Sequence, residues 1–173
     1  MNLPNAITLL RVFLLPLFIS LLVYGHRVWP VVLFSITALS DALDGFIARS
    51  WQQKTALGSI LDPIADKLFL TASFLTLAYV EAIPVWLMVI VVSRDGMLVI
   101  GALVIHILTG KLSVSPTILG KITTLIQFVT ILLILSLYAL EKNLVLISFM
   151  YDLTALFTIL SGLHYIYREI AKL

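Results

Sequence analysis

The sequence predicts an all-α integral membrane protein: a bundle of six transmembrane helices with a polar cavity that faces the cytoplasm. Three observations lead to this fold class. The chain is 61% hydrophobic and only 12% charged, with a mean hydropathy of +1.14, whereas soluble domains have roughly 45–50% apolar and 25% charged residues. Short polar or turn-forming segments divide the chain into six apolar stretches. Acidic residues are concentrated at one boundary between two of these stretches.

Each apolar stretch is long enough for a transmembrane helix, which needs about 20 apolar residues. The breaks between them are YGHRVWP, RSWQQKTALG, VEAIP, TGKLSVSPT and EKN. We therefore expect helices near residues 4–25, 29–50, 58–80, 84–108, 116–139 and 144–168. The tight connections indicate one domain over residues 1–173. The first stretch lacks a small-residue cleavage site where a signal peptide would carry one, so we expect a retained helix.

The distribution of Lys and Arg predicts the orientation. If the connection between the second and third helices is cytoplasmic, seven cations lie on that side and only two, Arg27 and Lys142, on the other. Both termini and the acidic segment then face the cytoplasm, in the cytoplasmic membrane. The net charge of +2 gives no reason to expect nucleic-acid binding. Because the chain has no cysteine, thiolate metal ligands are excluded.

A polar stripe marks the first predicted helix, where Asn5, Thr8 and Arg11 recur at three-residue steps. In one interpretation Pro4 opens the helix, Asn5 lies in its first turn and Arg11 snorkels to the membrane interface. In the other, the stripe borders the acidic segment from its N-terminal side. The sequence leaves both interpretations open.

Four aspartates lie within the 26 residues from 41 to 66, in a protein with only nine acidic residues. On each of two predicted helices, the aspartates share one face with small residues. The shared faces consist of Asp41, Asp44, Gly45 and Ala48 on the second helix and of Gly58, Asp62 and Asp66 on the third. Two helices joined by the polar turn could therefore point the four carboxylates toward one another. The small residues would leave room for a larger group to approach the backbone.

Carboxylates at this density cannot all stay ionised unless positive charge joins them. Two divalent cations with oxygen ligands would balance the four charges. Such a metal pair could hold a pyrophosphate and stabilise in-line displacement at phosphorus. The alternative is a set of helix-end aspartates that are solvated or paired with Arg49, Lys54 and Lys67.

The acidic segment resembles the signature of the CDP-alcohol phosphatidyltransferases, membrane enzymes that transfer a phosphatidyl group from CDP-diacylglycerol to an alcohol and release CMP. Written D-x2-D-G-x2-A-R-x8-G-x3-D-x3-D, the pattern is matched at all eight of its fixed positions. The resemblance implies two divalent ions, Mg²⁺ or Mn²⁺, held by Asp41, Asp44, Asp62 and Asp66. It also implies that Asp66 is the general base for the acceptor hydroxyl, and that the protein is a homodimer.

The resemblance extends to the donor-binding residues. The cytidine end of the donor would be admitted by Gly45, Ala48 and Gly58, with Arg49 nearby. The opening PN-x-x-T-x-x-R is also typical of many family members, which implies that Asn5 and Thr8 help to bind the nucleotide donor.

Two cations inside later apolar stretches are candidates for binding substrate phosphate. Arg94 lies within IVVSRDGMLVIGAL, where it either pairs with Asp95 or a neighbouring helix, or projects into the cavity and binds a phosphate. Lys121 forms a polar stripe with Thr124 and Gln127 at three-residue steps. It is either a positive-inside anchor or a second phosphate-binding cation.

We expect transfer of the phosphatidyl group to glycerol 3-phosphate, as in phosphatidylglycerophosphate synthases, with the lipid bilayer around the helices. The S-R-D and G-K-x-x-T-x-x-Q segments are also similar to CDP-diacylglycerol-type cardiolipin synthases, so phosphatidylglycerol is the alternative acceptor. Alternatives of other classes are a divalent-cation channel or transporter and a non-catalytic lipid-binding scaffold.

Overall fold

The computed structural model describes the backbone of residues 3–50, 58–109, 117–142 and 147–170, and the side chains of residues 10–40, 64–105, 107, 117–142 and 147–168. These residues form six α-helices: α1 (Leu3–Val23), α2 (Val28–Ser50), α3 (Gly58–Tyr79), α4 (Val85–Thr109), α5 (Ile118–Ala139) and α6 (Ser148–Ile170). The predicted helices are confirmed, with boundaries that differ by a few residues. The predicted position 116 of the fifth helix and positions 144–146 of the sixth lie outside the described residues.

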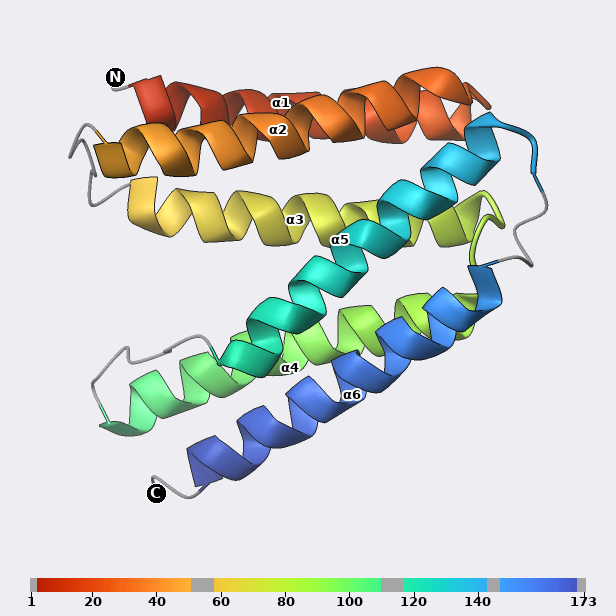
Figure 1. The fold of residues 1–173 in the computed structure, drawn as a ribbon. Helices are drawn as coiled ribbons and strands as arrows, with labels where there is room; N and C mark the ends of the chain where they lie inside the picture. The colour runs from red at the N-terminus through yellow and green to blue at the C-terminus, as the bar shows by residue number, and fades with distance from the viewer. Residues whose placement is uncertain (1–2, 51–57, 110–116, 143–146, 171–173) are drawn as a thin grey trace.

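The helices pack in two groups that α5 connects (Figure 1). α1 lies against both α2 and α3, whereas α4 lies against α3 and α6. α5 runs obliquely across the molecule and contacts α2, α3 and α6. The third helix therefore has neighbours in both groups, and it is the helix whose backbone carries Asp62 and Asp66.

Three turns lie together at one end of the bundle, joining α1 to α2, α3 to α4 and α5 to α6 (Figure 1). Each contains a residue with a positive φ just after the preceding helix: Gly25 (77°), Glu81 (58°) and Glu141 (54°). An ion pair between Arg27 and Glu141 joins the first of these turns to the last. The ends of α2 and α6 and the starts of α1 and α3 therefore share the opposite end of the bundle.

An aromatic cluster holds the first three helices together. Phe18, Phe34 and Phe69 come from α1, α2 and α3, and their ring centroids are 5.2–6.2 Å apart. Phe128 of α5 stacks on Phe34 with a centroid separation of 4.9 Å. Such aromatic pairs are worth about 0.5–1.5 kcal/mol beyond the apolar area that they bury. Because Phe69 follows Asp66 by three residues, the cluster also anchors the helical turn that carries this aspartate.

The contact between α5 and α6 contains a seam of buried polar side chains, which we call the α5–α6 polar seam. Gln127 donates from Nε2 to the hydroxyl of Thr158 at 3.2 Å. The hydroxyls of Thr130 and Thr154 are hydrogen-bonded to each other at 2.8 Å. All four residues are buried, so these polar groups satisfy one another inside an otherwise apolar contact.

Three of the described helices are long and apolar enough to cross a membrane. They are Val85–Ile105, Ile118–Ala139 and Ser148–Arg168. Leu10–Val23 and Val28–Ser40 are shorter apolar stretches in the described part of the chain. The all-helical, membrane-type composition is thus confirmed, whereas six crossings and a cavity on the cytoplasmic side stay predictions.

Candidate functional site

The last aspartate of the acidic segment is bound by an arginine from another helix. Arg11 of α1 donates to the Oδ1 atom of Asp66 on α3. The arginine side chain is only 5% exposed, whereas Asp66 is 37% exposed. An ion pair requires the ionised carboxylate, which is the form that can accept a proton or bind a cation. Arg11 thus borders the acidic segment, as one of the two interpretations of the first polar stripe predicts.

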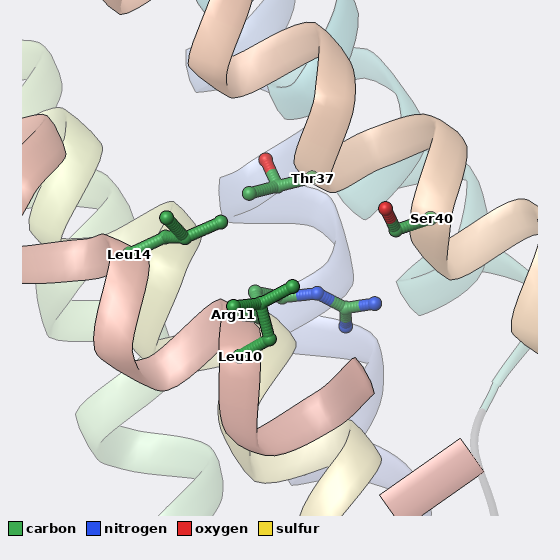
Figure 2. Close-up of a pocket in the computed structure, with 5 residues that line it drawn as sticks. All are labelled: Leu10, Arg11, Leu14, Thr37 and Ser40. Atoms are coloured by element: carbon green, nitrogen blue, oxygen red, sulfur yellow. The ribbon is translucent and has the colours of Figure 1, made fainter. Parts of the chain in front are cut away.

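A small hollow lies beside this ion pair, between α1 and α2. It is lined by Leu10, Arg11, Leu14, Thr37 and Ser40. Figure 2 shows Arg11 extending from α1 across the hollow, with Thr37 and Ser40 on the α2 side. Since Ser40 precedes Asp41 in the sequence, the hollow lies at the start of the acidic segment.

A second charged group, which we call the Lys67 triad, joins α3 to α4. It consists of Lys67, Arg94 and Asp95. The Oδ1 atom of Asp95 accepts from the Nζ of Lys67 at 2.5 Å and from the Nη1 of Arg94 at 2.8 Å. The side chains of Arg94 and Asp95 are 7% and 11% exposed, whereas that of Lys67 is 40% exposed. Two cations therefore share one carboxylate, and the lysine is the accessible member.

Two further helices contact Arg94. Its Nη2 donates to the hydroxyl of Ser161 on α6 at 2.6 Å. Gly120 of α5 lies so close that an added Cβ would be 3.4 Å from the same nitrogen. The Nε of Arg94 is buried and has no hydrogen-bond partner among the described residues. Pairing of Arg94 with Asp95 and with a neighbouring helix is one of the alternatives that the sequence leaves open, and the structure contains both contacts.

The predicted stripe on α5 divides into a surface part and a buried part. Lys121 is exposed, and the hydroxyl of Thr124 donates to the carbonyl of Gly120 in its own helix. Gln127 is buried in the α5–α6 polar seam. Lys121 follows Gly120 directly, at which an added Cβ would lie 3.4 Å from the Nη2 of Arg94.

The other predicted site residues are described only by their backbone. Asn5 and Thr8 lie on α1, the motif residues up to position 49 lie on α2, and the remaining ones lie at the start of α3. The side chains of these residues are outside the described set: Asn5, Thr8, Asp41, Asp44, Ala48, Arg49 and Asp62. The predicted convergence of the four carboxylates therefore stays a prediction.

A divalent ion is compatible with the described part of the site. No three His, Cys, Asp or Glu side chains gather to hold a metal among the residues that the structure describes. Only Asp66 of the four predicted ligands belongs to that set. Its carboxylate is partly exposed and already holds one positive group, that of Arg11. Carboxylate oxygens are the ligands that Mg²⁺ prefers, so the residue types fit this metal.

The family model for CDP-alcohol phosphatidyltransferase matches residues 1–161 of the chain. The chain belongs to this family. The match covers the Arg11–Asp66 pair and the Lys67 triad. It therefore extends well beyond the signature at residues 41–66.

Relatives within the family carry more than one enzyme name. The chain is 33% identical to a CDP-diacylglycerol–glycerol-3-phosphate 3-phosphatidyltransferase of Bacillus subtilis, over 95% of this chain and 93% of the relative. It is 37% identical to a protein of the same name from Aquifex aeolicus, over 76% and 74% of the two chains. It is also 32% identical to the cardiolipin synthase (CMP-forming) of Rattus norvegicus, over 75% of this chain. The chain spans about half the length of the animal cardiolipin synthases that it matches.

The sequence does not predict the Lys67–Asp95 contact. It indicates Lys67 only as a possible partner for the aspartates of the acidic segment. The available signal was the presence of Asp95 inside an apolar stretch that also contains Arg94, because a buried carboxylate needs compensating charge. That signal predicts a partner for Asp95 but does not say which helix supplies it.

Proposed function

We propose that this protein transfers a phosphatidyl group from CDP-diacylglycerol to glycerol 3-phosphate and releases CMP. The observation that carries the proposal is the pairing of Asp66 with Arg11, because it brings the arginine of the first polar stripe to the last aspartate of the family signature. The two bacterial relatives named as glycerol-3-phosphate 3-phosphatidyltransferases, which align over most of their lengths, support this choice of acceptor.

Four aspartates would hold two divalent ions, Mg²⁺ or Mn²⁺. These are Asp41 and Asp44 on α2 and Asp62 and Asp66 on α3. When bound, such ions supply positive charge to the pyrophosphate of the donor. Gly45, Ala48, Arg49 and Gly58 would admit the cytidine end of the donor, and Asn5 and Thr8 would contact it from α1.

Asp66 would act as the general base. Its carboxylate accepts the proton of the acceptor hydroxyl while the hydroxyl oxygen forms a bond to the phosphorus that carries the lipid. The bond from that phosphorus to the bridging pyrophosphate oxygen breaks, and CMP leaves with the electron pair. General-base help of this kind contributes roughly 10²–10⁴-fold to the rate. Arg11 would keep the carboxylate oriented between α1 and α3.

The anionic groups of the substrates would be bound by Arg94 and Lys121. Arg94 supports this role because its Nε is a buried donor with no partner among the described residues. Lys121 is exposed at the start of α5, one residue after Gly120, where an added Cβ would lie 3.4 Å from Arg94. Charge-assisted hydrogen bonds suit a phosphate, since they are stronger than neutral ones.

All six helices would cross the cytoplasmic membrane, with the site and both termini on the cytoplasmic side. The helices are 21–25 residues long, which corresponds to about 32–38 Å at 1.5 Å per residue. The excess of basic residues beside the α2–α3 connection supports the orientation. A homodimer is part of the proposal, and light scattering of the purified protein would test it.

Release of CMP tests the proposed reaction. We expect purified protein in lipid nanodiscs to release CMP from CDP-diacylglycerol when glycerol 3-phosphate is added. EDTA should abolish this release, and Mg²⁺ or Mn²⁺ should restore it. Full activity in a metal-free preparation would contradict the proposed role of the aspartates.

The same assay separates the alternatives. Transfer to phosphatidylglycerol but not to glycerol 3-phosphate would identify a cardiolipin synthase, the name that the animal relatives carry. Flux of divalent cations through the membrane without release of CMP would favour a channel or transporter.

A further inference from the structure

The Lys67 triad carries one positive charge more than it neutralises. Lys67 and Arg94 are cations, and Asp95 is the carboxylate that they share. No other acidic side chain pairs with either cation among the described residues. Unbalanced charge inside a helical bundle is costly, and charged groups that are kept there commonly mark a ligand site. The excess positive charge therefore favours the binding of an anion.

Within the triad, Lys67 is the cation that is more accessible to an anion. Its side chain is 40% exposed, whereas that of Arg94 is 7% exposed and is held by Asp95 and by Ser161. A lysine ammonium has three donors. Asp95 accepts one of them at 2.5 Å, so the others remain available to a ligand on the exposed side. The buried Nε of Arg94, which has no partner in the described part of the chain, is a second unused donor.

Lys67 is next in sequence to Asp66, the proposed general base. It follows Asp66 directly on α3, so the two Cα atoms differ by about 1.5 Å along the helix axis. Arg11 of α1 pairs with Asp66, and Asp95 of α4 pairs with Lys67. Two consecutive residues of α3 therefore have partners on two different helices. A small polyol phosphate has a hydroxyl at one end and an anionic group at the other. Because consecutive side chains on a helix point about 100° apart, such a molecule would have to extend across the surface of α3 to reach both the carboxylate of Asp66 and the ammonium of Lys67.

We infer that Lys67 is a specificity-determining residue that binds the phosphate monoester of the acceptor, while Asp95 and Arg94 position its ammonium. This inference rests on the proposed function and adds a cation to it. A phosphate monoester carries about −1.5 to −2 charges near neutral pH, whereas a phosphodiester carries one. The monoester therefore gains more from the excess positive charge than a lipid diester headgroup does.

Binding without turnover tests the inference directly. Glycerol 3-phosphate and inorganic phosphate would be titrated by calorimetry into the full-length protein in nanodiscs. Lys67→Met should weaken binding of both by about ten- to a hundredfold, the effect of losing one charge-assisted hydrogen bond. Lys67→Arg should restore most of the affinity. Lys142→Met is the matched control, because Lys142 is an exposed lysine just after the end of α5 and has no part in the Lys67 triad, and it should bind like wild type.

Turnover distinguishes a soluble phosphate from a lipid headgroup. In Lys67→Met, the KM for glycerol 3-phosphate should rise by the same factor as the Kd, while the KM for CDP-diacylglycerol changes little. The KM for phosphatidylglycerol should also change little, if that lipid is accepted. Lys67→Gln provides a second neutral variant in case the methionine variant does not fold, with thermal unfolding as the check.

Several outcomes would overturn the inference. Wild-type protein that binds neither phosphate probe would do so. Lys67→Met with an unchanged Kd, or with reduced stability and kcat at an unchanged acceptor KM, would leave Lys67 only a structural role. A rise in KM confined to phosphatidylglycerol would assign the lysine to a lipid headgroup and refute the monoester assignment. Phosphate binding through Lys67 in a protein that never releases CMP would preserve the anion site and refute the proposed function instead.

Discussion

Replacing Asp95 tests how strongly the Lys67 triad holds the helices together. Asp95→Leu removes the carboxylate and leaves Arg94 buried without its counter-charge. The Arg94–Asp95 hydrogen bond, at 2.8 Å between side chains 7% and 11% exposed, is worth about 1.5–3 kcal/mol. The bond to the more exposed Lys67 adds about 0.2–1 kcal/mol. We therefore expect a loss of about 2–4 kcal/mol in the free energy of unfolding.

The double variant Arg94→Met, Asp95→Leu should lose less stability than Asp95→Leu alone. Replacing both members of a buried pair by apolar side chains is often close to neutral, because no unpaired charge is left. What remains is the lost hydrogen bond to Ser161, about 0.5–1.5 kcal/mol, and the lost bond from Lys67, about 0.2–1 kcal/mol. Equilibrium unfolding in detergent, followed by tryptophan fluorescence, measures both values. Asp152→Asn, at an exposed position on α6, is the control. A double variant as unstable as the sum of its single variants would refute this account.

Three further predictions concern other parts of the molecule. Gly101→Ala should cost about 1–3 kcal/mol of stability, because the new Cβ would lie 3.0 Å from the ring of Tyr165. Gly96→Ala on the same helix, with no atom within 4 Å of the new Cβ, should stabilise by up to about 1 kcal/mol; equal effects would contradict the packing. Glu81→Gly should stabilise more than Glu141→Gly in the same unfolding assay, since both relieve a positive φ but only Glu141 pairs with Arg27. Asp66→Asn should reduce CMP release by roughly 10²–10⁴-fold while donor binding falls much less, and parallel losses would argue against a general base.

The helices of this protein are predictable because polar breaks separate long apolar stretches. The predicted helix at 58–80 is observed at Gly58–Tyr79, and the predicted one at 29–50 is observed at Val28–Ser50. The positive φ of Glu81 and Glu141 was not predictable in this way, because glutamate has no preference for that conformation. In the structure each glutamate hydrogen-bonds back to the preceding helix, from the Glu81 N–H to the Ala78 carbonyl and from the Glu141 N–H to the Tyr138 carbonyl.

From the sequence, the site residues can be placed along single helices, but their contacts between helices cannot be predicted. The spacing of Asp62 and Asp66 indicates one helix face, but it does not say which helix lies opposite. The approach of Arg11 to Asp66 joins residues 55 positions apart, and that of Lys67 to Asp95 joins residues 28 positions apart. Both contacts depend on how α1 and α4 pack against α3, which is decided by side-chain shape across the whole bundle. Sequence spacing contains no information of that kind.

The α5–α6 polar seam has a consequence for how the protein is made. The apolar stretch of α6 has a mean hydropathy of 1.2, against 2.1 for that of α5. Buried Thr154 and Thr158 contribute to this low value, and each meets a polar partner on α5. A polar group that faces hydrocarbon alone is unfavourable, whereas one that is already hydrogen-bonded to a neighbouring helix is much less so. The sixth helix should therefore leave the translocation machinery for the bilayer together with the fifth, as a preassembled hairpin.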